Sequence, residues 1–211
     1  MGSGKSNTAL NLAGRLGKAG LPAEAVTEGT DPHPVRGTDG LEHWHKPWLD
    51  ITPPELAERC LAKWRGYVQG ALATETLCIL DGQFFHGDFT NLFLMDAGTE
   101  ALEKYCKALE EIIQPLEPLL VYFHQDDFGR TIRDVSAERG EKWVRYQLDW
   151  KLQTPYSLRF GFEGLDGLIE LYRHYRALTD RLCAGLRMDK LSIENSQRAW
   201  ETYYQRIEAA L

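Results

Sequence analysis

The sequence has no long apolar run and few cysteines. No stretch of its 211 residues approaches the roughly 20 consecutive apolar residues that a membrane-spanning helix needs. The chain opens with a glycine-containing segment that runs into an amphipathic helix, a pattern that differs from a secretory signal peptide. The four cysteines are widely spaced, form no C-x-x-C pair and lie among apolar residues: Cys60, Cys78, Cys106 and Cys183. We therefore expect buried free thiols and a cytoplasmic protein.

The chain also lacks an excess of positive charge. Lysine and arginine total 24 against 31 aspartates and glutamates, which gives a net charge of −7. This balance argues against a broad binding surface for nucleic acid or for an anionic membrane. It leaves room for an anionic small molecule, because a phosphate site needs only a few local donors. The expected partner is therefore a small molecule.

The length and composition suit one α/β domain that spans residues 1–211. Hydrophobic residues make up 43% and charged residues 26% of the chain, as in ordinary globular proteins. There is no internal repeat, low-complexity tract or clear linker. Periodicity predicts a parallel sheet covered on both faces by helices, because helical and strand patterns alternate. We expect helices at 5–18, 52–73, 86–96, 99–114, 163–187 and from 196, a charged helical segment at 127–150, and strands at 22–28, 76–80, 119–123 and 190–194.

The first six residues carry the clearest motif. Gly4-Lys5-Ser6 fits the last three positions of the phosphate-loop pattern G-x-x-x-x-G-K-S/T, and an amphipathic helix follows at the correct offset. Backbone amides and the positive end of the helix dipole cradle phosphate in such loops. We expect Lys5 to reach the β- and γ-phosphates of ATP and Ser6 to hold Mg²⁺. The nucleotide-binding residues are predicted to be Gly2, Ser3, Gly4, Lys5, Ser6 and Asn7. The alternative is a flexible terminal segment.

A second acidic group is expected at the end of a buried strand. The apolar run 76–80 ends at Asp81, which we predict contacts Mg²⁺ or serves as a base. Gln83 lies just beyond and is a candidate contact to substrate. The alternative is that Asp81 is a turn residue before Gly82.

Arginines in the segment 126–150 are candidate lid residues. Arg130 and Arg133 are predicted to stabilise transferred charge, and Arg139 to contact the nucleotide. The alternative for each arginine is a solvated helix face balanced by neighbouring acids.

The acceptor side of the site is predicted near the loop 29–51. Glu28 is the last residue of the first predicted strand, 22–28, and His33 and Arg36 follow it in this loop. All three are candidate substrate-binding residues, with turn chemistry as the alternative. His43 and His45 have the spacing of a metal pair but lack further ligands, so an aromatic surface with Trp44 is favoured.

Taken in order, these parts resemble the P-loop kinase group around thymidylate kinase and the deoxynucleoside kinases. The resemblance rests on residues 2–6, Thr27-Glu28-Gly29, Ile79-Leu80-Asp81-Gly82, Val121-Tyr122-Phe123, the arginines and Leu191-Ser192-Ile193. It implies a three-layer P-loop NTPase fold, ATP with Mg²⁺, and phosphoryl transfer to a small acceptor such as a nucleoside or nucleotide. Members of the group usually carry an arginine beside the acid, where this chain has Gly82 and Gln83.

The resemblance also implies a central first strand and a first loop glycine that would lie before Met1. Without that strand its neighbours would lose a ladder of backbone hydrogen bonds. We therefore expect either that the true start lies upstream of Met1 or that the sheet has a gap or a borrowed strand. An unpaired strand edge would favour a homodimer. Two further functions stay open: nucleotide binding without transfer, and NTP hydrolysis.

Overall fold

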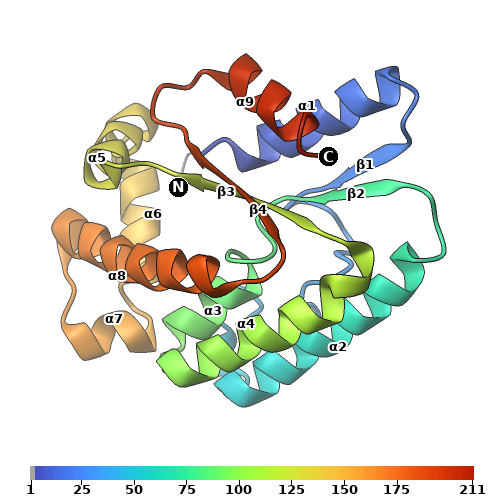
Figure 1. Cartoon of the computed structure of the whole chain (residues 1–211). Helices are drawn as coiled ribbons and strands as arrows, with labels where there is room; N and C mark the ends of the chain where they lie inside the picture. The colour runs from blue at the N-terminus through green and yellow to red at the C-terminus, as the bar shows by residue number, and fades with distance from the viewer. Residues whose placement is uncertain (1–2) are drawn as a thin grey trace.

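The structure is a computed structural model that describes residues 3–211. Its strands form two parallel pairs (Figure 1). In the first pair β1 (Ala23–Val26) lies beside β2 (Leu77–Leu80), with Ala23 opposite Leu77. In the second β3 (Leu119–His124) lies beside β4 (Asp189–Glu194), with Leu119 opposite Asp189. The chain is therefore a mixed α/β protein, as the alternating patterns predict.

Most of the predicted helices are present. The first, α1 (Lys5–Lys18), has the predicted bounds. The next, α2 (Pro53–Ala71), begins with the expected capping box, in which Thr52 and Glu55 satisfy each other's backbone amides. The others are α3 (Asp88–Leu94), α4 (Thr99–Ile113), α5 (Phe128–Arg139), α6 (Glu141–Lys151), α7 (Pro155–Phe160), α8 (Gly164–Gly185) and α9 (Trp200–Glu208), with short 3₁₀ turns η1 (Pro47–Leu49) and η2 (Gln114–Leu116).

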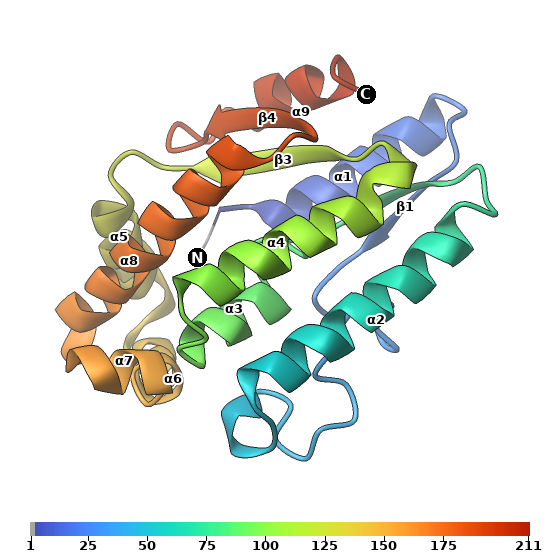
Figure 2. The ribbon, with the colours of Figure 1, turned by 60° about the horizontal axis from the view of Figure 1, so that its bottom comes forward.

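Helices lie on both sides of the strands (Figures 1 and 2). On one side α1 and α9 pack through Leu12, Tyr203 and Ile207 against apolar strand residues that include Val121 and Ile193. On the other side α2, α3, α4 and α8 form a larger core that reaches Leu80 and Leu120. Neighbouring strand residues thus point to opposite sides, as the two-residue period of a strand requires.

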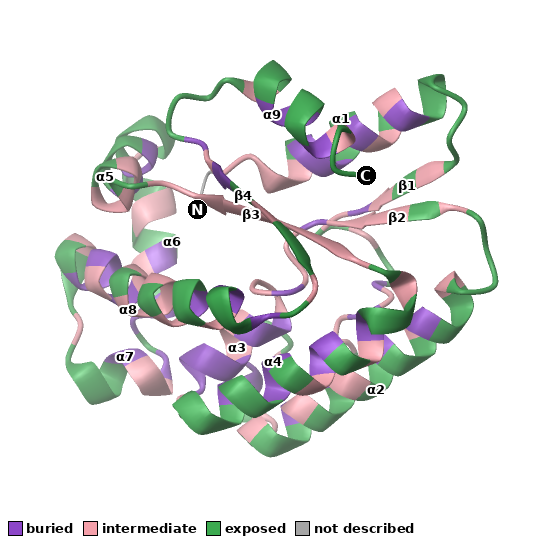
Figure 3. Ribbon diagram, viewed as in Figure 1, coloured by how far each residue is buried: buried purple, intermediate pink, exposed green. Residues whose placement is uncertain are grey.

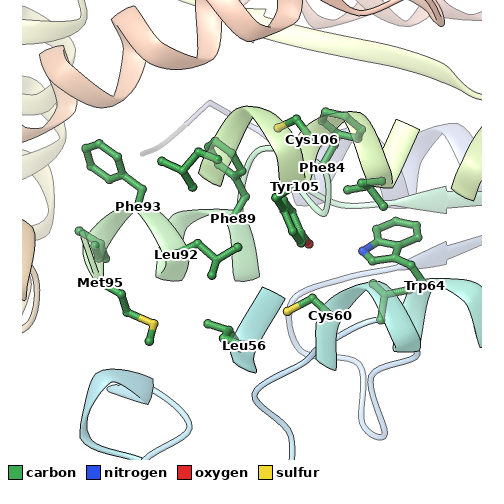
Figure 4. Close-up of a cluster of buried hydrophobic side chains, with 14 of the residues drawn as sticks. Leu56, Cys60, Trp64, Phe84, Phe89, Leu92, Phe93, Met95, Tyr105 and Cys106 are labelled. Atoms are coloured by element: carbon green, nitrogen blue, oxygen red, sulfur yellow. The ribbon is translucent and has the colours of Figure 1, made fainter. Parts of the chain in front are cut away.

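The larger core is rich in aromatic and sulfur-containing side chains (Figure 4). Leu56, Cys60 and Trp64 enter it from one face of α2, while Tyr105 and Cys106 enter from α4. Figure 2 shows α2 and α4 side by side beneath the strands. All four cysteines are free; Cys60, Cys106 and Cys183 are buried as expected, and Cys78 is partly exposed.

The sheet is interrupted between β2 and β3. No backbone ladder joins these two strands among the described residues, and each pair stands as a separate sheet. The registers direct the backbone groups of Cys78 and Leu80, and those of Val121 and Phe123, away from their paired strands and toward this gap. The prediction that β2 and β3 are buried on both faces is wrong in degree. Their residues are partly accessible because one edge of each strand is unpaired (Figure 3).

The region 127–164 differs most from expectation. The charged segment is divided into α5 and α6 at Gly140, whose φ of 80° lies in the left-handed region. Helix α7 was not predicted; Thr154 caps it by accepting a hydrogen bond from the Ser157 amide. The last helix begins at Trp200 rather than near residue 196. Within residues 3–211, every helix is too short or too polar to cross a membrane.

Candidate phosphate-binding site

The site begins with the turn that leads into α1. Gly4 has a φ of 74° and stands before the first helical residue, where no side chain caps the helix. A methyl group at Gly4 would overlap the indole ring of Trp200, so only glycine fits there. The side-chain amide of Asn195 donates to the Ser3 carbonyl oxygen at 2.7 Å. The first amides of α1 therefore remain available to an anion, on a turn that is held in place.

Ser6 meets Asp81 across 75 residues of sequence. The Ser6 hydroxyl donates to one carboxylate oxygen of Asp81, which directly follows β2. Asp81 is only 2% exposed, and its other carboxylate oxygen, Oδ1, is buried without a partner. The Asp81 amide bonds to the Val26 carbonyl oxygen at 2.8 Å and so continues the β1–β2 ladder. Gln83 donates to the Asp81 carbonyl oxygen at 3.0 Å and steadies the same turn.

Lys5 lies above the turn after β2. A methyl group at Gly82 would come within 2.7 Å of the Lys5 Cε, so the missing side chain makes room for this lysine. The Lys5 ammonium is 3.8 Å from the Glu28 carboxylate, which in turn lies 3.0 Å from His86 Nε2. The hydrogen bond from His86 and the charges of His86, Lys5 and Lys151 lower the pKa of Glu28 to about 2. Glu28 is thus ionised throughout the physiological range.

Lys151, at the end of α6, is a buried cation in the same neighbourhood. It is 4% exposed and makes no ion pair with any described residue. Its ammonium lies 4.0 Å from the ring centre of Trp150 and 5.7 Å from that of Tyr172. Burial lowers the pKa of Lys151 to about 8, against a smaller opposing effect of Glu28. The carboxyl ends of β1 and β2 are therefore bordered by positive charge.

Buried polar atoms without partners gather around this edge of the strands. Seven such side-chain atoms occur among the described residues, and four of them belong to Thr8, Asp81, His124 and Asn195. Thr8 is on α1, and the other three stand at or just beyond the ends of β2, β3 and β4. A buried polar group without a hydrogen bond costs roughly 1 to 3 kcal/mol. Four of the seven unpartnered atoms thus lie near the start of α1 or at the carboxyl ends of the strands.

The candidate lid arginines do not join this group. Arg130 pairs with Asp134 one turn along α5, Arg133 pairs with Asp166, and Arg139 stacks on Trp143. All three lie on exposed parts of α5, as the alternative interpretation of a solvated helix face predicts. Asn7 is exposed on α1, and Gly2 lies outside the described residues.

Two loop residues have structural contacts. His33 is 1% exposed, and its Nδ1 accepts the Val35 amide at 3.3 Å, so it stabilises a turn inside the loop 29–51. Arg36 donates to the Glu28 carbonyl oxygen and pairs with Asp39 at 3.3 Å. Arg36 therefore ties the loop to the end of β1. Neither contact places the side chain beside Lys5.

Protein groups alone do not form a metal site in residues 3–211, where no three His, Cys, Asp or Glu side chains converge. His43 instead pairs with Asp50 at 2.7 Å. The pair of Ser6 and Asp81 nevertheless suits Mg²⁺, which is usually bound by one or two protein oxygens together with phosphate and water. The unpartnered Oδ1 of Asp81 is an oxygen of the required kind.

Two cavities lie away from the loop. One of about 340 Å³ is bordered by Asp126, Arg133 and Arg173, and a shallow one of about 470 Å³ by Arg59, Lys63 and Tyr67. Their linings include none of residues 3–6, Glu28 or Asp81.

Sequence reasoning missed three members of the site: His86, Lys151 and Asn195. Asn195 directly follows β4, and the rule that ligands bind at the carboxyl ends of parallel strands was a signal for it. No sequence pattern marks His86 or Lys151. His86 reaches the site through the path of the turn after β2, and Lys151 through the packing of α6.

Comparisons with protein families, with curated proteins and with solved structures find no match for this chain.

Proposed function

We propose that the protein binds ATP with Mg²⁺ in a P-loop NTPase-like arrangement and transfers phosphate to a small acceptor. The contact between Ser6 and Asp81 is the observation that carries this proposal. It brings the hydroxyl of a G-K-S motif to the acid at the end of a neighbouring parallel strand. These are the two protein groups that hold Mg²⁺ beside a phosphate loop. The uncapped start of α1 next to them adds amide donors for phosphate oxygens.

Each residue has a distinct part in the proposed site. Lys5 would exchange its contact with Glu28 for the β- and γ-phosphate oxygens, while the α1 amides hold the remaining charge. Ser6 and Asp81 would hold Mg²⁺, which neutralises charge that develops on the transferred phosphate. With a pKa of about 2, Glu28 is suited to accept a hydrogen bond from the acceptor and orient it.

The test is binding of Mg·ATP to the purified chain, measured by calorimetry. Lys5→Ala should weaken binding by at least about tenfold, because it removes a charge-assisted contact to phosphate. Lys18→Ala removes the same charge from the exposed end of the same helix and should leave affinity unchanged. Equal affinities for Lys5→Ala and the unaltered chain would refute the proposal.

The lid arginines favour a second candidate function, nucleotide binding without transfer. Transfer needs positive charge near the leaving phosphate, and the three arginines of α5 are engaged at its surface. Incubation with labelled ATP and a panel of alcohols, nucleosides and nucleotides separates the two. A labelled acceptor supports the kinase, binding without any labelled product supports the second candidate, and free phosphate alone indicates a hydrolase.

A further inference from the structure

We propose that Lys151, with His86 beside Glu28, forms an anion-binding subsite for the acceptor. The acceptor would then be an alcohol that carries its own acidic group, either a phosphate monoester or a carboxylate. This inference rests on the proposed function in one respect: the bound anion is the phosphate acceptor only if the protein is a kinase. The anion-binding subsite itself can be tested separately from ATP binding.

The first step is that Lys151 is a buried cation with no anionic partner. Lysine is almost never fully buried unless it is paired, and an unpaired buried charge costs folding free energy. The described residues offer it the faces of Trp150 and Tyr172 but no carboxylate in contact. An anionic ligand would supply the missing partner.

The second step is that the backbone that carries Lys151 is held in position. The Lys151 carbonyl oxygen accepts hydrogen bonds from Thr154 and Ser157 at 2.9 and 2.8 Å, which fixes the end of α6. The neighbouring Trp150 donates from its indole nitrogen to the His45 carbonyl oxygen at 2.9 Å, so this end also contacts the loop 29–51. A cation that stands on a fixed backbone between two aromatic rings loses less freedom when it binds an anion than a lysine on a mobile segment would.

The third step is the balance of charge. Glu28 is the acid that acts on Lys151, and it already contacts Lys5 and His86. Lys5 and Lys151 share this one acid, because Asp81, the other carboxylate of the site, bonds to Ser6 and is not among the groups that act on Lys151. Lys151 therefore has no carboxylate of its own among the described residues, and the ionised Glu28 lies beside it. A hydroxyl bound to Glu28 and an acidic group bound to Lys151 can belong to one small molecule.

The alternative is that Lys151 only supports packing between its two aromatic neighbours. Lys151→Met separates the two ideas, because methionine keeps an unbranched apolar chain without charge. If Lys151 serves a ligand, this variant binds anions poorly and is at least as stable as the unaltered chain. If the ammonium serves packing, the variant is less stable.

The experiment uses three alcohols with related carbon skeletons: glycerol 3-phosphate, glycerate and glycerol. Binding is measured by calorimetry with a non-hydrolysable ATP analogue present, so that the phosphate loop is occupied. We expect the unaltered chain to bind one of the two anions and to bind glycerol much more weakly. The tighter of the two anions distinguishes phosphate from carboxylate.

Lys151→Met should weaken binding of the preferred anion by at least about tenfold, the loss expected for a charge-assisted contact. Lys151→Arg should retain part of it, and Lys142→Met, which alters an exposed lysine of the same helix, should have no effect. Mg·ATP affinity should be unchanged in Lys142→Met, because this lysine lies outside the site. Absence of anion binding, unchanged binding in Lys151→Met, or a lower melting temperature of that variant would overturn the proposal.

Failure here and failure of the proposed function give different results. If Lys5→Ala binds ATP as tightly as the unaltered chain, the kinase proposal fails. The anion titrations would still show whether Lys151 binds an anion. They are then run without the ATP analogue and in the Lys5→Ala background, where the phosphate loop is impaired. If Lys151→Met does not fold, the ammonium serves packing and the proposal is overturned; unchanged anion affinity across pH 8 in the unaltered chain overturns it as well.

Discussion

At the scale of single residues, Gly4 shows most directly how backbone conformation and packing fix one amino acid. Its φ of 74° and its contact with Trp200 both exclude a side chain. Gly4→Ala should therefore lower the free energy of unfolding by about 1 to 3 kcal/mol. Gly14→Ala, inside α1 with open space around it, should instead raise it by about 0.5 to 1 kcal/mol. Urea unfolding of the two variants measures both effects; destabilisation by Gly14→Ala as large as that by Gly4→Ala would contradict the structure.

Lys151 gives a second residue-scale prediction, which concerns pH. Its pKa is about 8 in the folded chain, below the value of about 10.4 for a free lysine. Between these values the unfolded chain binds more protons, so this lysine destabilises the fold most below pH 8, and its cost fades as pH rises to about 10. The stability advantage of Lys151→Met should therefore shrink over this window. Unfolding curves of the two proteins from pH 6 to pH 10 test it, and a constant difference would contradict it.

The same lysine predicts how anion affinity depends on pH. The groups that act on or contact it are Glu28 at the end of β1, Trp150 on α6 and Tyr172 on α8; His86 and Lys5 surround Glu28. Glu28 stays ionised, and free lysines keep their charge well above neutral pH. The change in anion affinity near pH 8 is therefore expected to come from Lys151. Anion affinity should fall as pH rises through about 8, and calorimetry at pH 7 and pH 9 measures the fall.

At the scale of elements, the two inner strand edges should be visible in hydrogen exchange. In β3 the amides of Val121 and Phe123 face the gap, while that of Tyr122 bonds to β4. In β2 the amides of Cys78 and Leu80 face the gap, while that of Ile79 bonds to β1. Exchange should therefore alternate along both strands, with the inward amides faster. Uniform protection along β3 would show that its inner edge is paired.

Local sequence signals predicted some elements well and others poorly. The capping box at Thr52 and the glycine-led start of α1 are local signals, and both helices lie where they were expected. The break at Gly140 was hidden, because the charged residues on both sides suit one continuous helix. Helix α7 is only six residues long, and its capping side chain is that of Thr154. Such short elements are decided by tertiary packing rather than by periodicity.

At the scale of the whole molecule, those parts of the candidate site that lie at the start of a helix or at the end of a strand could be predicted from the sequence. Lys5, Ser6, Asp81 and Glu28 stand at the start of a helix or at the carboxyl end of a strand, and parallel strands bring such positions to one edge. Lys151 and His86 reach that edge through the packing of α6 and the turn after β2. The arginines of α5 are candidate lid residues only because of their positive charge, which does not determine where a helix points them. In the structure two of them form ion pairs at the surface.

The interrupted sheet also has a mechanical consequence. Asp81 and Glu28 belong to the β1–β2 pair, whereas Asn195 follows the β3–β4 pair. The short turn from Ser3 to Ser6 is fastened to both, through Asn195 at one end and Asp81 at the other. Resistance to sliding of one strand pair past the other thus depends on helix packing and on this turn. A ligand bound by the turn would add a further connection between the two strand pairs. The protein with ligand bound would then unfold at a higher pulling force than the protein without it.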